Sequence, residues 1–511
     1  MNKIYITTPI YYVNDKPHVG HAYTSIACDA LARFYRMMGY EVFFLTGTDE
    51  HGLKIQQSAE KKDVEIQAFV DEVSKNFQNL SESLMLTNDH FIRTTSSQHK
   101  KSASFFWETL FSKEHIYLDK YAGWYSVRDE AYYQEEELVD GKAPTGSEVE
   151  WVEEPSYFFK LSEWQQPLLK FYSENPEFIK PKSRYNEVLK FVESGLKDLS
   201  VSRTGFSWGI PVPENNNHVM YVWLDALVNY LSAIGYPDTN SDKFKRFWPA
   251  DLHVVGKDIL RFHGVYWPAF LMAAGLPLPK QLVAHGWWTV EKEKMSKSLG
   301  NVVDPNEIIN EFGLDQFRYF LLREVPFGND GDFSRDSLIS RINSDLANNF
   351  GNLINRVFSM ILKNFSGKIP ENLKQEPTEE ILINKIDLLA CKYKDQISST
   401  DFSKGISSVI EIVSLINKYI DTNEPWTLAK KNNIDRLSTV LRISLESIRI
   451  LSFLIYPVCP FSSMKILKAL GLGEENLTLE SETFTNFNFL TEDVVITKVD
   501  LLFPKIDKKL S

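Results

Sequence analysis

The spacing of hydrophobic positions changes along the chain and predicts a parallel sheet first and helices last. Residues 3–8 form an apolar, strand-like run, residues 19–38 carry apolar side chains at helical spacing up to Gly39, and residues 41–46 form a second apolar run. Apolar runs joined by a helix-length segment are typical of a β-α-β unit, and glycine commonly ends a helix. The first 60 residues therefore predict the opening of a doubly wound nucleotide-binding domain.

This rhythm stops in the middle of the chain and later returns. Residues from about 119 to 195 are rich in aromatic, acidic and glycine residues, which indicates an inserted domain. An apolar helix is expected at 219–235, and buried strands are expected at 252–257 and within 281–290.

Beyond Gly300 the apolar spacing becomes helical. One stripe comprises Ile342, Leu346, Phe350, Leu353, Ile354 and Val357, and another comprises Ile406, Val409, Ile410, Val413, Ile416 and Ile420. The predicted fold class is α/β, with a doubly wound (Rossmann-like) parallel-sheet domain that carries an insertion and is followed by an all-α bundle. The expected segments are 1–118 and 216–305 for the two halves of the sheet domain, 119–215 for the insertion, 306–340 for a linker and 341–511 for the bundle.

Composition places the chain among proteins with several cores and no membrane span. Its 511 residues are 43% hydrophobic, and the longest apolar stretch, 448–461, is shorter than the roughly 20 residues needed to cross a bilayer. The N-terminus lacks the pattern of a secretory signal. Three widely spaced cysteines, Cys28, Cys391 and Cys459, offer no disulfide framework, so we expect a reducing, cytoplasmic location.

The net charge of −12 is unevenly distributed. Residues 341–511 contain 21 Lys+Arg and 21 Asp+Glu, so the whole acidic excess lies in residues 1–340. Phosphate binding depends on the local field more than on net charge. The acidic total therefore does not exclude a nucleic-acid partner, and the neutral helical part does not prove one.

Two short motifs carry the predicted chemistry. Pro17-His18-Val19-Gly20-His21 lies where the first strand leads into the first helix, where backbone N–H groups and imidazoles can bind phosphate and Gly20 leaves space for a base or ribose. Such a histidine pair is equally compatible with simple helix capping. Lys294-Met295-Ser296-Lys297-Ser298 follows a buried strand, and its two lysines could clamp a triphosphate, although such a run taken alone is usually a solvated loop.

The two motifs together resemble the paired signatures of class I aminoacyl-tRNA synthetases in order, spacing and structural context. The resemblance implies ATP as substrate, with His18, Gly20, His21, Gly256, Lys294, Ser296 and Lys297 at the nucleotide and His18, His21, Lys294 and Lys297 stabilising its phosphates. The chain has no P-loop sequence, so it does not resemble P-loop enzymes.

Further blocks resemble the methionyl branch of that class over nearly the full length of the chain. They are TPIYYVNDKPHVGHAYT at 8–24, GTDEHG at 47–52, YVWLDA at 221–226, GKDILRFH at 256–263, AHGWWT at 284–289 and KMSKSLGN at 294–301. The resemblance implies a methionine pocket formed by Ile10, Tyr12, Asp49, Trp223, Ala226, Tyr230, Asp258, Ile259 and His263, with Asp49 at the ammonium group. Aromatic rings suit a thioether, although Trp223 and Tyr230 on an apolar helix are also compatible with core packing.

By the same resemblance Asp258 lies beside the substrates and pairs with Arg203, although an ordinary structural ion pair is an alternative. Many relatives carry a zinc knuckle in the insertion, but the matching positions here are Ser126, Asp129, Ala143 and Gly146. Three of these four side chains offer no metal ligand. We therefore expect no structural zinc and no other bound metal, and a knuckle held by aromatic residues such as Trp124, Tyr132, Tyr133 and Trp151.

In the helical part, Asn352, Arg356 and Trp426 match positions at which family members bind the anticodon. Asn and Arg can hydrogen-bond to base edges and indole can stack on a base, although a lone tryptophan after proline is normally a packing residue. The resemblance implies a methionine–tRNA ligase that uses Mg²⁺-bound ATP, L-methionine and tRNA(Met). We expect a monomer, because no dimerising module follows the bundle.

Two other kinds of function fit the sequence less well. A cysteinyl enzyme usually needs a cysteine-ligated zinc and a leucyl enzyme needs a large editing insertion, and neither feature is present in the sequence. A catalytically silent tRNA-binding paralogue would carry damaged motifs, whereas both motifs are intact.

Overall fold

The computed structural model describes residues 2–13, 16–129, 131–133, 135–290, 293–295, 301–371, 375–479, 484–491 and 493–507. The chain divides into two compact units. The sheet unit comprises residues 3–17 and 42–285, and the helical unit comprises residues 1–2, 18–41 and 286–511. No helix in the described part of the chain is long and apolar enough to cross a membrane.

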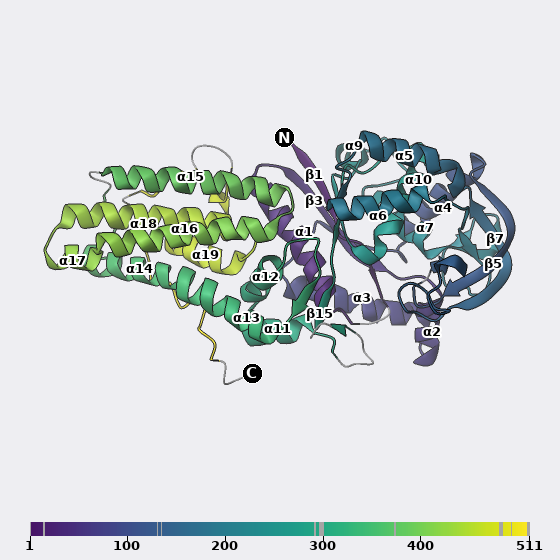
Figure 1. The fold of residues 1–511 in the computed structure, drawn as a ribbon, viewed down its shortest axis with the longest axis horizontal. Coiled ribbons are helices and arrows are strands. Elements are labelled where there is room, and N and C mark those ends of the chain that lie inside the picture. Colours follow the sequence, from purple (N-terminus) through teal and green to yellow (C-terminus); the bar gives the residue numbers. More distant parts are fainter. Residues whose placement is uncertain are drawn as a thin grey trace. The chain divides into compact units, whose positions relative to one another are not determined.

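A seven-stranded sheet forms the centre of the sheet unit (Figure 1). Its order is β2-β3-β1-β13-β14-β8, with β4 paired to β3. The strands are β1 (Lys3–Thr7), β2 (Tyr11–Tyr12), β3 (Glu41–Asp49), β4 (His90–Arg93), β8 (Ile179–Lys180), β13 (Leu252–Gly256) and β14 (Leu282–His285). The recorded pairings of β13 with β1 and β14, and of β3 with β2 and β4, are parallel. Continuous burial along β14 is what a parallel sheet covered on both faces requires.

Helices surround this sheet and complete its core. They are α2 (Leu53–Lys61), α3 (Ile66–Ser83), α4 (Ser97–Ser112), α5 (Gln165–Glu174), α6 (Lys182–Glu193), α7 (Val222–Leu227), α8 (Asn229–Ser232), α9 (Asp242–Phe247) and α10 (Trp267–Ala274). A short 3-10 helix, η3 (Lys257–Ile259), and a π-helical turn, η4 (Phe262–Tyr266), connect β13 to α10. Trp107 of α4 and Trp267 of α10 are among the largest fully buried side chains, so large aromatic side chains fill much of the interior.

The expected insertion contains antiparallel strands. β5 (Ile116–Ser126), β6 (Ala131–Tyr133), β7 (Glu150–Phe159) and β9 (Leu199–Ser200) pair in the order β6-β5-β7-β9, and β10 (Ser202–Arg203), β11 (Pro211–Val212) and β12 (Asn215–Met220) form a second small sheet. Between them the chain returns to the main sheet, because β8 pairs with β14. The range 119–215 therefore supplies one edge strand of the parallel sheet as well as the insertion.

The helical unit begins with α1 (Val19–Met37) and resumes with a small sheet of β15 (Trp288–Val290), β16 (Glu293–Lys294) and β17 (Gly331–Phe333). The helices that follow are α11 (Pro305–Phe312), α12 (Leu314–Arg323), α13 (Arg335–Arg341), η6 (Ile342–Gly351), α14 (Asn352–Phe365), α15 (Pro377–Ser398), α16 (Phe402–Asn423), α17 (Pro425–Lys430), α18 (Ile434–Ile455) and α19 (Pro460–Ala469). In Figure 1, α14, α15, α16 and α18 run alongside one another as a bundle.

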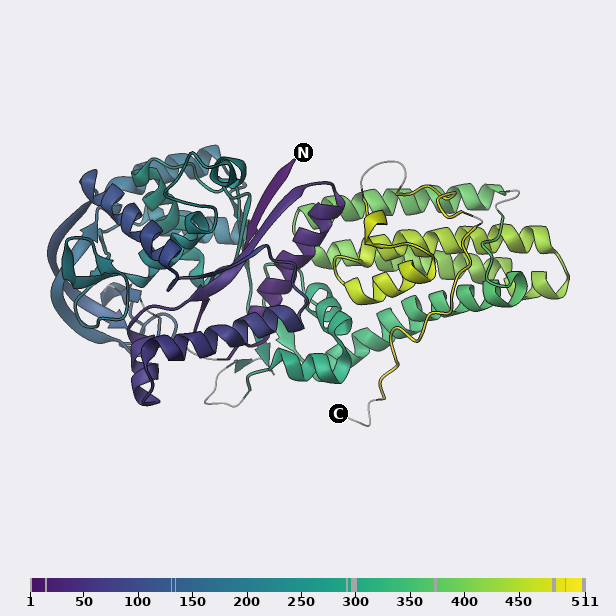
Figure 2. The same ribbon diagram turned by 180° about the vertical axis from the view of Figure 1, so that it is seen from behind.

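Buried charged side chains of α18 bind the chain segment around residues 484–486 to this bundle. Arg449 of α18 is fully buried, pairs with Glu446 at 2.7 Å, and donates to the carbonyl oxygens of Phe484 and Asn486. Arg442 pairs with Glu446 at 3.2 Å. Figure 2 shows the segment around 484–507 lying along the helices. A buried guanidinium group is tolerated because its hydrogen-bonding capacity is met by carboxylate and carbonyl oxygens.

The predicted α/β fold class and both apolar stripes are confirmed, with two local corrections. The first stripe, which includes Ile342 and Val357, is buried along η6 and α14. The helix expected at 219–235 begins only at Val222, because Val219 and Met220 pair with β10. The run 281–290 contains two strands rather than one. It breaks at Gly286, where a Cβ atom would lie 2.3 Å from backbone atoms of Asn329.

Candidate active site

The two motif histidines cap α1 with their side chains. The Nδ1 atom of His18 accepts a hydrogen bond from the Gly20 N–H at 3.0 Å, and the Nδ1 atom of His21 accepts from the His18 N–H at 3.0 Å. Burial, followed by electrostatic interaction with the neighbouring His18 ring, lowers the pKa of His21 well below its ordinary value. Because each Nδ1 atom is an acceptor, each neutral ring carries its hydrogen on Nε2, which is the donor it can offer to a phosphate oxygen.

Gly20 is required by this cap itself. A Cβ atom at position 20 would lie 2.8 Å from Cε1 of His18, so a larger residue would displace the capping ring. The sequence suggested only that Gly20 leaves room for a nucleotide. Capping and phosphate binding are compatible, because capping uses Nδ1 and a phosphate would use Nε2.

The second motif begins on a hairpin of the same unit. Lys294 lies on β16 opposite Thr289 of β15, and β15 runs parallel to β17. After the motif, the Val303 carbonyl accepts a hydrogen bond from the Val19 N–H at 3.1 Å, at the start of α1. Ser296 and Lys297 lie outside the described residues. Within the helical unit, the chain segment after the second motif is therefore hydrogen-bonded to α1, the helix that begins inside the first motif.

The sheet unit brings Tyr230 and His263 into direct contact. Burial lowers the pKa of His263 to about 4, so the ring is neutral at pH 7. Its Nδ1 atom lies 3.1 Å from the Ile259 carbonyl oxygen and its Nε2 atom lies 2.7 Å from the Tyr230 hydroxyl. A ring that donates through Nδ1 accepts through Nε2, so Tyr230 donates to His263. This order fixes the orientation of both side chains.

Trp223 stacks on a residue that the sequence did not single out. The rings of Trp223 and Phe262 are 3.8 Å apart with an interplanar angle of 4°, and the ring of His263 meets Trp223 edge-on at 6.0 Å. Phe262 could have been suspected because it belongs to the block GKDILRFH. Trp223 is only half-buried, so core packing does not fully account for it, whereas Tyr230 is 1% exposed.

The remaining candidate pocket residues come from neighbouring elements of this unit. Ile10, Tyr12, Trp223 and Ile259 are half-buried and pack against the main core. Asp49 ends β3 beside Tyr12 of β2, and Ala226 is buried on α7. Half-buried apolar side chains at the carboxyl ends of parallel strands are typical of a ligand site in a doubly wound sheet.

Asp258 lies on η3, directly after β13, and is exposed. A Cβ atom on Gly256 would lie 2.5 Å from the Asp258 carboxylate, so glycine at 256 permits that carboxylate position. Arg203 pairs with Glu154 at 2.9 Å and lies over the ring of Tyr125. The pairing of Arg203 with Asp258 stays a prediction.

The knuckle segment is built around one carboxylate. The Asp129 carboxylate accepts hydrogen bonds from Ser147 at 2.9 Å, from Tyr133 at 3.1 Å and from Thr145, and the Asp129 N–H donates to Ser126. In the part of the chain that the structure describes, no group of three or more His, Cys, Asp or Glu could hold a metal ion. Part of the expected aromatic support is present, whereas the side chain of Tyr132 lies outside the described part of the structure. Trp124 meets Trp151 edge-on, and Trp151 is 54% exposed.

The helical unit brings Arg356 and Trp426 together. The Arg356 guanidinium lies 5.6 Å from the centre of the Trp426 ring and pairs with Asp421 at 2.6 Å. Trp426 is 41% exposed, which argues against the core-packing alternative. Asn352 is exposed at the start of α14, one turn before Arg356.

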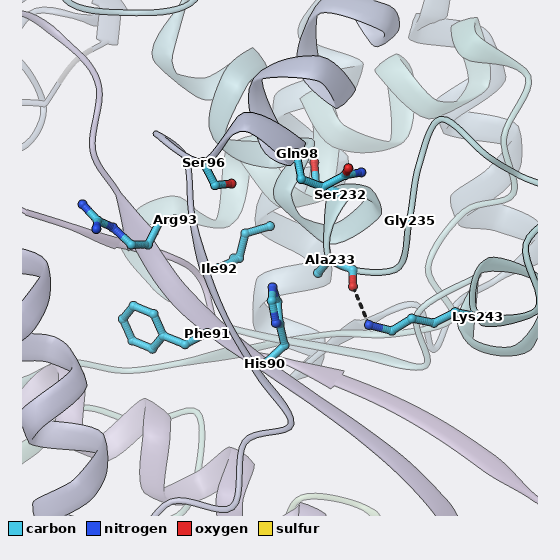
Figure 3. Close-up of a pocket in the computed structure, with 10 residues that line it drawn as sticks. All are labelled: His90, Phe91, Ile92, Arg93, Ser96, Gln98, Ser232, Ala233, Gly235 and Lys243. Atoms are coloured by element: carbon cyan, nitrogen blue, oxygen red, sulfur yellow. Dashed lines mark hydrogen bonds between the residues drawn. The ribbon is translucent and has the colours of Figure 1, made fainter. Parts of the chain in front are cut away.

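A separate cavity of about 500 Å³ in the sheet unit lies beside β4, α4 and α8 (Figure 3). Lys243 reaches across it to donate to the Ala233 carbonyl at 2.8 Å, and His90 and Ser232 also line it. None of the lining residues labelled in Figure 3 is among the predicted site residues.

Comparison with known proteins identifies the class of this fold. Residues 4–150 and 135–358 match the family described as tRNA synthetases class I (M). Residues 369–510 match the anticodon binding domain of methionyl tRNA ligase. A class I synthetase architecture therefore extends over nearly the whole chain.

Individual relatives identify the branch of the class I synthetases to which the chain belongs. The methionine–tRNA ligase of Rickettsia felis is 54% identical over 479 residues, 93% of each chain, and that of Rickettsia conorii is 52% identical over 99% of this chain and 100% of its own. The solved structure of Mycobacterium tuberculosis methionyl-tRNA synthetase in complex with methionyl-adenylate superposes with a TM-score of 0.95, at 46% identity over 99% of this chain and 100% of that one. The chain belongs to the methionyl-tRNA synthetase family, the ATP-dependent class I ligases that join methionine to tRNA.

Proposed function

We propose that the chain aminoacylates tRNA(Met) in the cytoplasm, as a monomer, by two substitutions. The methionine carboxylate first attacks the α-phosphorus of Mg²⁺-bound ATP, forming methionyl-adenylate and releasing pyrophosphate. A hydroxyl of the 3′-terminal ribose, the 2′-hydroxyl in class I enzymes, then attacks the adenylate carbonyl carbon and releases AMP. The methionyl-adenylate bound by the Mycobacterium tuberculosis relative is the intermediate that this sequence of steps requires.

Methionine is held by the residues of the sheet unit. Trp223, Tyr230 and His263 surround the thioether with rings, which make favourable contacts with sulfur, and Ile10, Tyr12, Ala226 and Ile259 complete the apolar wall. Asp49 pairs with the α-ammonium group, and Asp258, with Arg203 as its partner, lies beside the reacting carboxylate. The observation that carries this assignment is the fixed hydrogen-bond order Ile259–His263–Tyr230 beside the stacked Trp223 and Phe262 rings.

ATP is held by the motif residues. The Nε2–H groups of His18 and His21 donate to phosphate oxygens, and Lys294 and Lys297 neutralise the charge that develops as pyrophosphate leaves, with Ser296 beside them. Gly20 and Gly256 allow the nucleotide to approach the backbone. No side-chain nucleophile is required, because positioning and charge stabilisation suffice for in-line transfer to a carboxylate.

The helical unit selects the tRNA. Trp426 offers an exposed indole on which an anticodon base stacks, and Asn352 and Arg356 hydrogen-bond to base edges. The same proposal includes two structural assignments. Asp129 supports the knuckle in place of zinc. The chain is divided into a catalytic domain at 1–118 and 216–305, an insertion, a linker and an anticodon-binding bundle at 341–511.

Methionine-dependent ATP–pyrophosphate exchange, followed by charging of tRNA(Met), tests the proposal. Exchange should require methionine and be far weaker with leucine, which fills a similar volume without sulfur. Equal exchange with both amino acids, or none with methionine, would show that the pocket is wrongly assigned.

A further inference from the structure

Three buried side chains form a continuous polar chain next to the proposed methionine pocket. The Asp225 carboxylate lies 2.6 Å from Nδ1 of His51 and 2.7 Å from Nε2 of His99. All three residues are at most 2% exposed. On its far side, Nδ1 of His99 lies 3.1 Å from the Ser232 hydroxyl, and Ser232 borders the cavity of Figure 3.

Both imidazoles donate to Asp225, because an ionised carboxylate only accepts. Burial alone would raise the pKa of Asp225, but the two imidazoles outweigh burial and hold that pKa well below its ordinary value. Each carboxylate oxygen thus has its own ring as a donor. Removal of either ring would leave a buried carboxylate oxygen without that partner, and such an unsatisfied group is costly.

The chain of contacts joins three elements of the sheet unit. His51 follows the end of β3, two residues after Asp49, and Asp225 lies on α7 between Trp223 and Ala226. His99 belongs to α4 and supplies a rigid third anchor, since α4 is a 16-residue helix. The elements that carry the proposed ammonium partner and the proposed thioether wall are therefore held at one spacing by Asp225.

A second set of hydrogen bonds holds the end of β3 through the backbone of Glu50. The Glu50 N–H donates to Thr94 at 2.9 Å, and the Glu50 carbonyl accepts from the Trp208 indole at 2.6 Å. Neither bond reaches α7. His51, by contrast, links the end of β3 directly to α7 through its hydrogen bond with Asp225.

We propose that His51, Asp225 and His99 are positioning residues for methionine, which set the distance between Asp49 and the wall formed by Trp223 and Ala226. The proposal rests on the proposed function of that pocket. In this role they act on methionine through the elements that carry Asp49, Trp223 and Ala226.

The proposal is tested by substitutions that either keep or remove a hydrogen-bond donor at the place of the imidazole nitrogen that contacts Asp225. Asparagine at 51 retains a donor near the place of Nδ1, whereas glutamine does not. At 99 the order reverses, since glutamine retains a donor near the place of Nε2 and asparagine does not. In pyrophosphate exchange, His51→Gln and His99→Asn should raise the KM for methionine about 10-fold or more, because a pocket with altered spacing binds methionine more weakly. His51→Asn and His99→Gln should stay within about threefold of wild type, with kcat and the KM for ATP little changed in all four.

Leu110→Ala is the control for a purely structural effect, because Leu110 is fully buried on the same helix as His99, three turns further along. It should lower the melting temperature and leave the KM for methionine unchanged. Partial unfolding does not disguise the result, since KM is independent of the amount of active enzyme.

Equal KM values for the donor-keeping and donor-losing variants, or the same rise in Leu110→Ala, would overturn the proposal. Trp223→Ala separates this failure from failure of the pocket assignment. If Trp223→Ala raises the KM for methionine and the histidine variants do not, only the positioning role is wrong. If none of the variants changes it, the pocket itself is misassigned.

Discussion

Replacement of Trp426 gives the sharpest test of anticodon binding. Trp426→Leu removes the aromatic face but retains most of the apolar contact, whereas Trp426→Phe retains an aromatic face. If the indole stacks on an anticodon base, leucine should cost about 1–3 kcal/mol in kcat/KM for tRNA charging, which is roughly 5- to 150-fold. Phenylalanine should recover most of that loss.

The stability change should be small for a reason visible in the structure. Trp426 is 41% exposed on the short helix α17, so it does not fill a closed cavity, and leucine still covers the apolar surface beneath it. We expect a loss of about 1 kcal/mol or less, well below the roughly 3–5 kcal/mol for truncating a fully buried aromatic residue to alanine. A fall of a few degrees in melting temperature is the corresponding measurement.

Charging of tRNA(Met) is the informative assay, and pyrophosphate exchange is its internal control because exchange needs no tRNA. A second tRNA with an altered anticodon should be rejected less strongly by Trp426→Leu than by wild type. Equal losses in leucine and phenylalanine variants, a parallel loss in exchange, or unchanged discrimination would each refute stacking and direct attention to Asn352 and Arg356.

Four further outcomes are expected. Lys297→Ala should lower the rate of adenylate formation strongly and leave the affinity for methionine nearly intact, because the lysine acts on charge that develops in the transition state; a weaker affinity with an unchanged rate contradicts this role. Trp223→Ala should cost roughly 2–4 kcal/mol in methionine binding, measured as a raised KM. Elemental analysis should find no stoichiometric zinc, and chelators of zinc should not inhibit exchange. The pKa of His263, about 4, lies below its ordinary value, so the unfolded chain binds a proton at this residue more readily than the folded chain does. The contribution of His263 to the free energy of unfolding is therefore complete above about pH 6.5 and is lost as the pH falls toward 4. His263→Gln should flatten the dependence of stability on pH in this range.

The apolar pattern was enough to predict much of the secondary structure. The run at 3–8, the helix from Val19 and the stripe through Leu346 and Leu353 all have their expected form, because period and burial are local properties of the chain. Motif chemistry was also readable from sequence, since the order and spacing of two short segments carried the family resemblance. Where the pattern was ambiguous it failed locally. An apolar run such as 219–220 suits a strand as well as a helix, and only the pairing with β10 decides.

The tertiary structure alone decided which side chains meet. Asp225 lies 174 residues from His51 and 126 from His99 in sequence, and no local spacing predicts that a carboxylate on α7 lies between two imidazoles. The same holds for Asp129, which gathers hydroxyl groups from Tyr133, Thr145 and Ser147, and for the stacking of Phe262 on Trp223. The sequence determined the elements and the residue types available for chemistry, whereas packing of those elements determined the contacts, because contacts between distant segments depend on topology rather than on local periodicity.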